Sequence, residues 1–429
     1  MDLFPHIPII TAMKISAFGE KFTAKSGILE LMDDLGKAVA GDEKVCMLGG
    51  GNPAQIDEVQ EVWRKRLFAL LGDGSLEKAL VSYDTPQGRH SFLEAVSGLL
   101  KENFGWDIGP ANIAITNGSQ PAFFILFNLF AGMNAEGVKK KILFPLCPEY
   151  IGYADQGVEE DIFTTCPASI EEIDEFTFKY HVDFSKLELS DDIGAVCVSR
   201  PTNPTGNVIS DDEVKQLSEL AESADVPLII DNAYGAPFPR IIFEDVNPFW
   251  NKNTILSMSL SKIGLPSVRT GIIVANPEVI EAVSSCNAII NLANVNIGQV
   301  LTESMFRSSE ILEISRDKVM PFYRNKSIQA QEWIRKYMPP QVDYRVHKSE
   351  GAIFLWIWFK NLSITSRELY ERLKKRKVII VPGEYFFFGL EKDWEHSRQC
   401  IRLNYSQDEA SVEEGIRLIA EEAAKAVNS

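Results

Sequence analysis

The chain has 429 residues, of which 45% are hydrophobic and 24% are charged, values that are ordinary for globular proteins. This length allows a large buried core and more than one domain. The formal net charge of −17 argues against nucleic acid or an anionic membrane as a partner, because both repel an acidic surface.

The N-terminal segment MDLFPHIPIITAMKIS has an acid at position 2 and no basic start, unlike a secretory signal peptide. The longest apolar stretch, around residues 123–130, is too short to cross a bilayer. We therefore expect a cytoplasmic protein, with Met13 as an alternative start. The six cysteines have no C-x-x-C spacing and no accompanying histidine tract, which predicts buried, reduced thiols and no metal site.

The middle of the chain alternates short β-rich runs with helical patterns. Five runs rich in Val, Ile or Leu predict buried strands at residues 141–147, 193–199, 226–231, 254–259 and 271–275. Between them, a helix is predicted over 211–224, with Ser210 as its N-cap and acids in its first turn. This alternation predicts an α/β fold in which helices cover both faces of a mainly parallel sheet.

The last third of the chain has a different pattern. Helical patterns at 308–337 and 366–376 flank strand-like stretches at 352–359 and 377–381, and an amphipathic helix at 408–427 closes the chain. We interpret this part as a second, smaller α+β domain. The predicted divisions are an N-terminal arm with part of the small domain over 1–60, a large domain over 61–310 and the small domain over 311–429.

Polar residues follow the predicted strands of the large domain, where ligands collect in open α/β sheets. After the second, third and fourth strands come, in order, Arg200 and Asn203; Asp231 and Tyr234; and Ser259, Ser261, Lys262 and Arg269. Taken singly, each has an ordinary explanation, such as a solvated lysine, a turn-capping aspartate or a tight Asn-Pro-Thr-Gly turn. Together they supply the groups that one cofactor, pyridoxal phosphate, requires.

The phosphate of that cofactor needs hydrogen-bond donors and positive charge. The predicted start of an apolar helix at Gly118, Ser119 and Gln120 offers free backbone N–H groups and the positive end of the helix dipole. Hydroxyl donors and a guanidinium come from the residues after the fourth strand, Ser259, Ser261 and Arg269.

The pyridine ring needs a different set of partners. An ionised Asp231 opposite the ring nitrogen would keep it protonated, and Tyr234 and Asn203 could donate to the 3-oxygen. Lys262 is the only lysine in this set, so it is the candidate for the Schiff base and for proton transfer. Burial and a neighbouring cation would lower its pKa toward the useful range.

The order aromatic, Asn, Asp-x-x-Tyr, Ser-x-Ser-Lys and Arg resembles the class I/II aminotransferases of fold type I, from about Gly49 to the C-terminal helix. The resemblance implies a seven-stranded large-domain sheet and a homodimer that uses pyridoxal 5′-phosphate. It further implies that Tyr150 stacks on the pyridine ring and that Tyr83 reaches the phosphate of the partner subunit. For the substrate α-carboxylate it implies an arginine clamp, Arg402, and a closing segment made of Gly50, Gly51 and Asn52.

Longer strings, among them MLGGGNPAQI, PEYIGYAD and EGAIFLWIWFK, narrow the resemblance to members that act on L-valine and pyruvate. That implies a ping-pong reaction giving 3-methyl-2-oxobutanoate and L-alanine. No second arginine lies in a motif suited to a distal carboxylate, in accord with a small neutral substrate. The choice among valine, alanine and 2-aminobutyrate stays open, as does the role of Arg200, where the family frequently has asparagine.

Three alternatives remain. A C–S β-lyase would use the same ring-binding residues, and only its products would differ. A cofactor-binding regulator without turnover would carry an N-terminal DNA-binding domain, for which too few residues precede the GGGN segment. A catalytically inactive scaffold would be expected to lose the lysine, and Lys262 is present.

Overall fold

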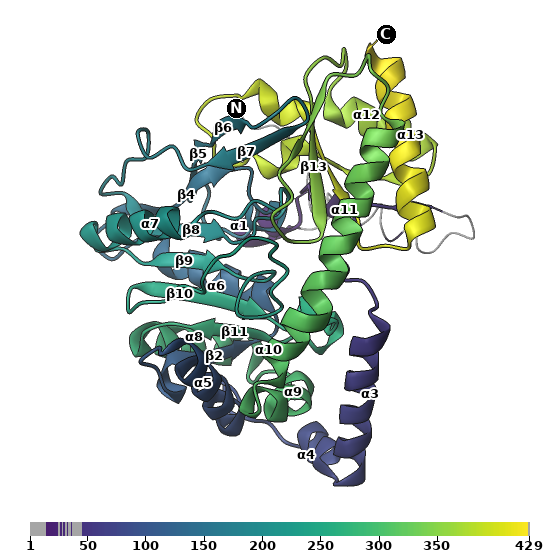
Figure 1. The fold of residues 1–429 in the computed structure, drawn as a ribbon. Helices are drawn as coiled ribbons and strands as arrows, with labels where there is room; N and C mark the ends of the chain where they lie inside the picture. The colour runs from purple at the N-terminus through teal and green to yellow at the C-terminus, as the bar shows by residue number, and fades with distance from the viewer. Residues whose placement is uncertain are drawn as a thin grey trace.

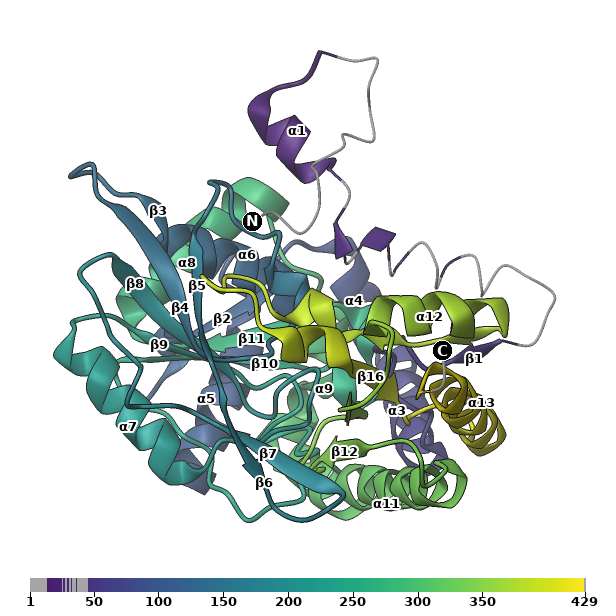
Figure 2. The ribbon, with the colours of Figure 1, turned by 90° about the horizontal axis from the view of Figure 1, so that it is seen from above.

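The computed structural model describes residues 14–427 except 25, 28, 31, 33–35 and 37–44. The predicted alternative start at Met13 therefore lies outside the described residues. The first described element is the short helix α1 (Ala17–Phe22), which begins with Ser16 as its N-cap. Seen from above, α1 projects from the rest of the molecule (Figure 2).

A large twisted sheet forms one half of the molecule (Figure 1). Its strands, in spatial order, are β2 (Ile113–Thr116), β11 (Gly271–Val274), β10 (Thr254–Ser259), β9 (Leu228–Asp231), β8 (Ile193–Ser199), β4 (Lys139–Cys147) and β5 (Phe163–Pro167). Of these, β11 alone runs antiparallel to its neighbours, and the two-residue β3 (Gly132–Met133) adds an antiparallel pairing to β4. The predicted mainly parallel, seven-stranded sheet is confirmed among the described residues.

Hydrophobic side chains cover both faces of this sheet, as expected for parallel strands. Along β9, Ile229 packs into one buried cluster and its neighbours Leu228 and Ile230 into another, since successive side chains point to opposite faces. Helices α6 (Ser119–Phe130) and α8 (Pro277–Asn291) cover the first face. The opposite face is covered by α5 (His90–Phe104), α7 (Asp211–Ser223) and α9 (Ile297–Arg307).

Several predicted boundaries agree with the structure. Strands β8 and β10 have the predicted limits, and α7 begins with the predicted N-cap, where Ser210 and Glu213 form a capping box. Strand β9 begins two residues later than predicted, after Pro227, which has no N–H for the ladder. Strands β2 and β5 were not predicted, because one has only four residues and the other is rich in threonine and half-buried.

A second, six-stranded sheet lies beside the first. Its order is β15 (Val381–Pro382), β16 (Cys400–Asn404), β13 (Phe354–Phe359), β12 (Tyr344–His347), β7 (Thr177–His181) and β6 (Ser169–Glu172). A separate parallel pair joins β1 (Cys46–Met47) to β14 (Val378–Ile379). The β6–β7 hairpin comes from the middle of the chain, within the predicted large-domain range, yet it pairs with the C-terminal strands.

Helices from the last third of the chain flank this second sheet (Figure 1). They are α11 (Met320–Tyr337), α12 (Ser366–Lys375) and α13 (Glu409–Val427). The single helix predicted over 308–337 is two helices, α10 (Glu310–Ile314) and α11, joined by a π-helical turn at Ser315–Val319 just before Pro321. A proline removes one helical N–H and crowds the preceding turn, which accounts for the interruption. The helices α3 (Asp57–Gly72) and α4 (Ser75–Val81) lie apart from the second sheet.

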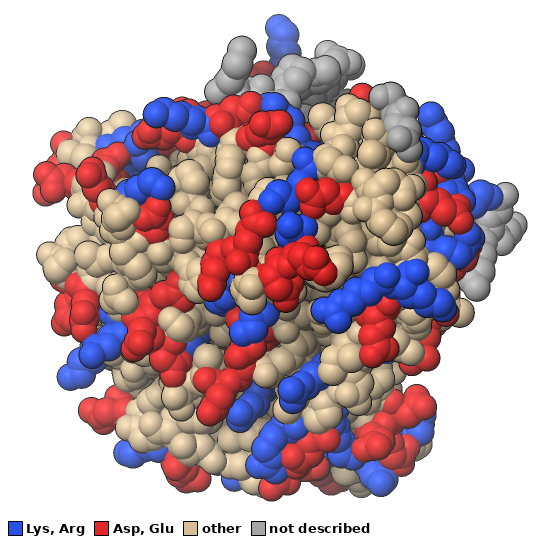
Figure 3. Space-filling model, turned by 45° about the horizontal axis from the view of Figure 1, so that its top comes forward, with Lys and Arg blue, Asp and Glu red and all other residues tan. Residues whose placement is uncertain are grey.

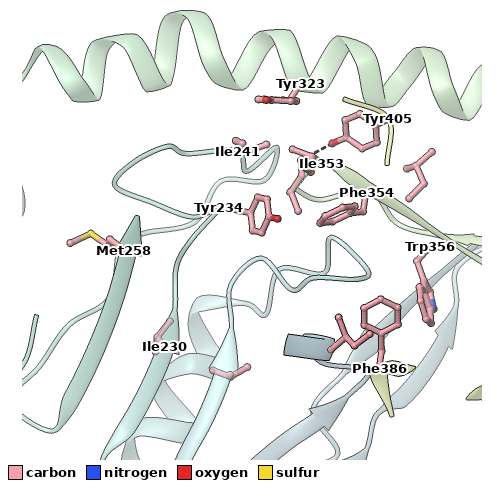
Figure 4. Close-up of a cluster of buried hydrophobic side chains, with 14 of the residues drawn as sticks. Ile230, Tyr234, Ile241, Met258, Tyr323, Ile353, Phe354, Trp356, Phe386 and Tyr405 are labelled. Carbon is pink, nitrogen blue, oxygen red and sulfur yellow. Dashed lines mark hydrogen bonds between the residues drawn. The ribbon is translucent and has the colours of Figure 1, made fainter. Parts of the chain in front are cut away.

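Aromatic side chains join the two halves. Tyr234, in the loop after β9, meets Phe354 of β13 edge to face, with ring centroids 5.8 Å apart (Figure 4). Nearby, the N–H of Ala352, just before β13, donates to the carbonyl of Ile241, in the segment after β9, over 2.9 Å. This packing places the carboxyl ends of β8, β9 and β10 against the second sheet.

The surface carries charges of both signs. On the face shown in Figure 3, acidic and basic side chains are interspersed, with no continuous basic track. Among the described residues, no helix combines the length and hydropathy needed to cross a bilayer.

Candidate active site

A cavity of about 390 Å³ opens where the ends of the large-sheet strands face the second sheet. Most of the predicted site residues line it: Gly51, Asn52, Ser119, Gln120, Tyr150, Asn203, Asp231, Tyr234, Ser259, Ser261, Lys262, Arg269 and Arg402. Three predicted residues do not line it, namely Gly50, Gly118 and Tyr83. The structure thus brings together side chains that the sequence spreads over more than 350 positions, from Gly51 to Arg402.

One end of the cavity is suited to an anion. Gly118 is the N-cap of α6 with φ +96°, and a Cβ there would lie 2.0 Å from Nη2 of Arg269, so a glycine is required. Ser119 Oγ is buried and has no hydrogen-bond partner. Ser259 Oγ donates to Ser261 Oγ over 2.9 Å. The unpaired hydroxyl, the helix N-terminus and the guanidinium converge as a phosphate group requires.

Asp231 lies at the end of β9 and is 9% exposed. Its Oδ2 accepts a hydrogen bond from the hydroxyl of Tyr153, and its Oδ1 accepts from the N–H of Ala233 over 2.9 Å. Burial raises the pKa of Asp231 above its usual range, while the two hydrogen bonds and the charge of Lys262 act against that rise. A cation beside this carboxylate, such as a protonated ring nitrogen, would stabilise its ionised form.

Tyr153 was missed by sequence reasoning. It belongs to the 3₁₀ turn Ile151–Tyr153, is buried and lies at the cavity wall. The signal available in the sequence was its spacing, three residues after Tyr150 in PEYIGY. Tyr150 itself lines the cavity with its ring perpendicular to that of Tyr153, centroids 5.1 Å apart. A Cβ at Gly152 would lie 2.4 Å from the Tyr150 ring, so the turn needs a glycine to admit that ring.

Lys262 lies on the 3₁₀ turn Ser261–Ile263 and is half-buried. Its Nζ donates to the carbonyl of Gly51 over 2.6 Å and lies 5.2 Å from the Tyr234 ring centroid. Burial, with the positive charges of Arg402 and Arg269, lowers the pKa of Lys262 to about 8. About a tenth of this amine is therefore unprotonated and nucleophilic at pH 7, far more than for an ordinary lysine.

Arg402, on β16, faces Lys262 from the second sheet. It is 2% exposed, and its Nη1 donates to Asn203 Oδ1 over 2.7 Å and its Nη2 to the carbonyl of Gly49 over 2.5 Å. Its Nε is buried without a partner, and its guanidinium lies 4.2 Å from the Phe354 ring centroid. Burial lowers the pKa of Arg402 to about 10, so it remains a cation. A planar guanidinium held this way is suited to a carboxylate.

The N-terminal segment is held over the cavity through its carbonyl groups. Gly50 accepts from Asn404 Nδ2 over 2.6 Å, and Asn52 accepts from Ser406 Oγ over 2.8 Å. Gly51 and Asn52 line the cavity, whereas Gly50 does not line it and instead anchors the segment to Asn404.

Two further residues have roles that the sequence did not define. Arg200 is buried and donates to the carbonyls of Ile209, over 2.8 Å, and Asn247, over 3.0 Å, and it forms an ion pair with Asp211 at 2.5 Å. These contacts hold the start of α7 and make Arg200 a structural residue. Tyr83 is 84% exposed and lies away from the cavity.

The cysteines and potential metal ligands lie outside this chemistry. None of the six cysteines is in a disulfide; four are buried, while Cys166 and Cys286 are half-buried, so the prediction of buried thiols holds for four. Within the described part of the chain, no group of three or more His, Cys, Asp or Glu side chains is placed to hold a metal ion.

Comparison with known proteins gives concordant results. Residues 50–419 match the family model for class I and II aminotransferases. The chain is 50% identical over 414 residues to the valine–pyruvate aminotransferase of Escherichia coli (strain K12), covering 96% of this chain and 99% of that one. The crystal structure of a valine–pyruvate aminotransferase from Salmonella typhimurium LT2 superposes with a TM-score of 0.87 at 48% identity, covering 94% and 100% of the two chains. A crystal structure of a protein from Psychrobacter arcticum 273-4 gives a TM-score of 0.95 at 46% identity, covering 97% and 100%.

Proposed function

The chain belongs to the class I and II aminotransferase family, and from that premise we propose that it transfers the amino group of L-valine to pyruvate with pyridoxal phosphate as cofactor. The products are 3-methyl-2-oxobutanoate and L-alanine, formed in two half-reactions of ping-pong type. The observation that carries this proposal is the cavity in which Lys262, Asp231 and the Arg402–Asn203 pair converge.

The cavity residues fit the cofactor. The unpaired Ser119 Oγ, the N-terminus of α6 and Arg269 would hold its phosphate, Asp231 its ring nitrogen and Tyr150 one face of its ring. Lys262 would hold it covalently. When bound, the cofactor supplies an electron sink that makes the Cα–H bond of an amino acid acidic.

The protein's own groups perform the remaining tasks. The guanidinium of Arg402, held by Asn203 Oδ1, binds and orients the α-carboxylate of the substrate. Lys262 Nζ, with its pKa lowered to about 8, would accept the proton from the substrate Cα and would deliver the same proton to C4′ of the cofactor. The carbonyl-anchored segment at Gly51 and Asn52 covers the cavity and limits access of water.

The charges at the cavity support a small neutral substrate. Among its described lining residues, the cations are Lys262, Arg269 and Arg402, and each already has a partner in the proposed mechanism. None is left for a second carboxylate, so an aspartate or glutamate side chain would enter without a counter-charge. The apolar part of the lining, including Phe123, Ile151 and Pro53, is suited to an aliphatic side chain. Other small neutral amino acids, such as alanine and 2-aminobutyrate, are the second candidate substrates.

The proposal includes a homodimer. A patch of exposed apolar side chains surrounds Tyr83 and the C-terminal end of α8: Leu80, Val81, Tyr83, Ile289, Leu292 and Val295. Asn296 Nδ2 donates to the carbonyl of Ser82 over 2.9 Å, which joins the two parts of this patch, and Val295 N–H donates to Asn117 beside the phosphate end of the cavity. A patch of this kind indicates a protein interface, and Tyr83 would reach the partner subunit's phosphate across it. None of the six cysteines forms a disulfide, which supports a reducing, cytoplasmic location.

The test is reconstitution with pyridoxal phosphate followed by spectroscopy and product analysis. We expect a visible absorption band that L-valine removes, with alanine formed on adding pyruvate, and turnover of L-aspartate at least about a hundredfold slower, because its second carboxylate would be unpaired. Lys262→Ala should lose the band and about four orders of magnitude in kcat while keeping its thermal midpoint. Ammonia and thiol released from a cysteine conjugate would instead indicate the β-lyase, and folded wild-type protein that binds no pyridoxal phosphate would refute the proposal.

A further inference from the structure

A second buried carboxylate, that of Glu149, lies behind the cavity wall. Glu149 precedes Tyr150 in the chain, is 1% exposed and does not line the cavity. Three donors converge on it. Its Oε1 accepts from the N–H of Ser199 over 2.8 Å, while its Oε2 accepts from Ser199 Oγ over 2.8 Å and from the N–H of Tyr150 over 3.0 Å.

These hydrogen bonds connect two parts of the proposed cofactor site. Ser199 ends β8 and is the register partner of Asp231 on β9. The next residue, Arg200, donates its N–H to the carbonyl of Asp231 over 2.8 Å. The Glu149 carboxylate therefore links two segments of the proposed cofactor site. One is the backbone of Tyr150, whose side chain would stack on the cofactor ring; the other is the β8–β9 strand pair, which carries Asp231, the proposed partner of the ring nitrogen.

The carboxylate is retained at an energetic cost. Burial raises the pKa of Glu149 to about 7, and the carboxylate of Asp231 adds to this rise, while the three donors oppose it. Among the described residues, the titratable groups that interact with Glu149 are Asp231, Tyr153, Cys147 and Cys197, and none of these four is a cation. A buried carboxylate in this environment is tolerated because both of its oxygens accept hydrogen bonds.

We propose that Glu149 is a positioning residue that sets the separation between Tyr150 and Asp231, and thereby the position of the cofactor ring. The inference rests on the proposed function, since it concerns the same cofactor. Glutamine at this position has one acceptor oxygen. Whichever way the amide is turned, its NH₂ group faces a backbone N–H, that of Ser199 or that of Tyr150. Either the Ser199 segment or the Tyr150 segment must then move, and Tyr150 and Asp231 no longer have the separation that the cofactor ring requires.

The experiment compares Glu149→Gln with the wild type and with a matched control, Glu213→Gln. Glu213 is also a buried carboxylate that accepts backbone N–H groups, those of Ser210 and Val182, but it lies on α7, outside the cavity. The measurements are the Kd of pyridoxal phosphate, the induced circular dichroism of its visible band, kcat and KM for L-valine, and the thermal midpoint of the apoprotein.

For Glu149→Gln we expect the Kd of pyridoxal phosphate to rise about tenfold, the induced circular dichroism to fall, and kcat to fall more than KM changes. Glu213→Gln should lower the thermal midpoint and leave the other readouts unchanged. Ser199→Ala removes one donor only and should raise the Kd about two- to threefold, which tests the proposal even where Glu149→Gln does not fold. A wild-type Kd and dichroism in Glu149→Gln and Ser199→Ala, or equal losses in Glu213→Gln, would overturn it. Failure of the wild type to bind the cofactor would refute the proposed function instead.

Discussion

Two buried polar regions of the molecule differ in how their hydrogen bonds are satisfied. In the second sheet, the hydroxyl of Tyr180 accepts from Trp356 Nε1 over 3.0 Å and lies 2.5 Å from His396 Nε2. His347 Nε2 accepts from the N–H of Tyr180 over 3.2 Å, and its Nδ1 lies 2.8 Å from the carbonyl of Lys348. This network is closed on itself.

The cavity is built from similar polar groups and is left open. Ser119 Oγ and Arg402 Nε are buried without partners, and the amine of Lys262 is held with a lowered pKa. Buried polarity by itself therefore does not mark a functional site. Groups whose hydrogen bonds close within the fold support its structure, whereas buried groups left open toward one cavity are available to a ligand.

Among polar groups whose hydrogen bonds are satisfied within the fold, we expect the largest effect at the buried ion pair of Lys179 and Glu350. This pair joins the second sheet to the loop after Asn203. Glu350 is 2% exposed and also accepts the N–H of Val208 over 2.9 Å. Glu350→Gln leaves the buried ammonium of Lys179 without its counter-charge and should lower the free energy of unfolding by about 3–5 kcal/mol. Urea unfolding of the apoprotein measures this. Glu58→Gln, which breaks an exposed pair with Lys318, is the control and should change the midpoint little. If Glu350→Gln lowers the free energy of unfolding no more than Glu58→Gln does, the proposed structural role of the closed polar groups is contradicted.

The next effect is a pH dependence of the closed network. Burial lowers the pKa of His396 to about 3, so between pH 3 and 6.5 the unfolded chain binds a proton that the folded chain does not. Stability should therefore fall as the pH falls below about 6.5, by about 2 kcal/mol from this residue at pH 5. His396→Gln should remove that part of the slope. The measurement is the unfolding midpoint of the wild type and of His396→Gln at pH 7.5 and at pH 5. An equal change of stability with pH in the two proteins would show that His396 does not contribute.

The smallest predicted effect concerns the open group Ser119. Its hydroxyl has no partner in the fold, so Ser119→Ala should leave the stability of the apoprotein unchanged and weaken pyridoxal phosphate binding about fivefold, the value of one hydrogen bond. Ser257→Ala is the matched control, because Ser257 Oγ, in β10, is also buried and unpaired but does not line the cavity. Should both variants bind the cofactor equally well, the open hydroxyl of Ser119 would have no role in binding.

Features that depend on neighbouring residues in the chain could be predicted from the sequence. Strands β8 and β10, the capped start of α7, Asp231 at the end of its strand and Lys262 just after its own follow from short apolar runs and turn signals. Such patterns are local, so they survive without knowledge of the rest of the fold. The resemblance extended this to Arg402, which the structure joins to Asn203 by a hydrogen bond across 199 positions.

The hydrogen-bond partners of the polar side chains could not be predicted in this way. The tertiary structure placed the hydroxyl of Tyr153 on Asp231, used Arg200 to hold α7, and carried the β6–β7 hairpin to the second sheet. It also buried Glu149 behind Tyr150. These pairings depend on how distant segments pack, and each side chain could have formed other hydrogen bonds in a different packing. The local pattern therefore predicts the elements and their polar ends, while the packed core selects the partners that turn those ends into a site.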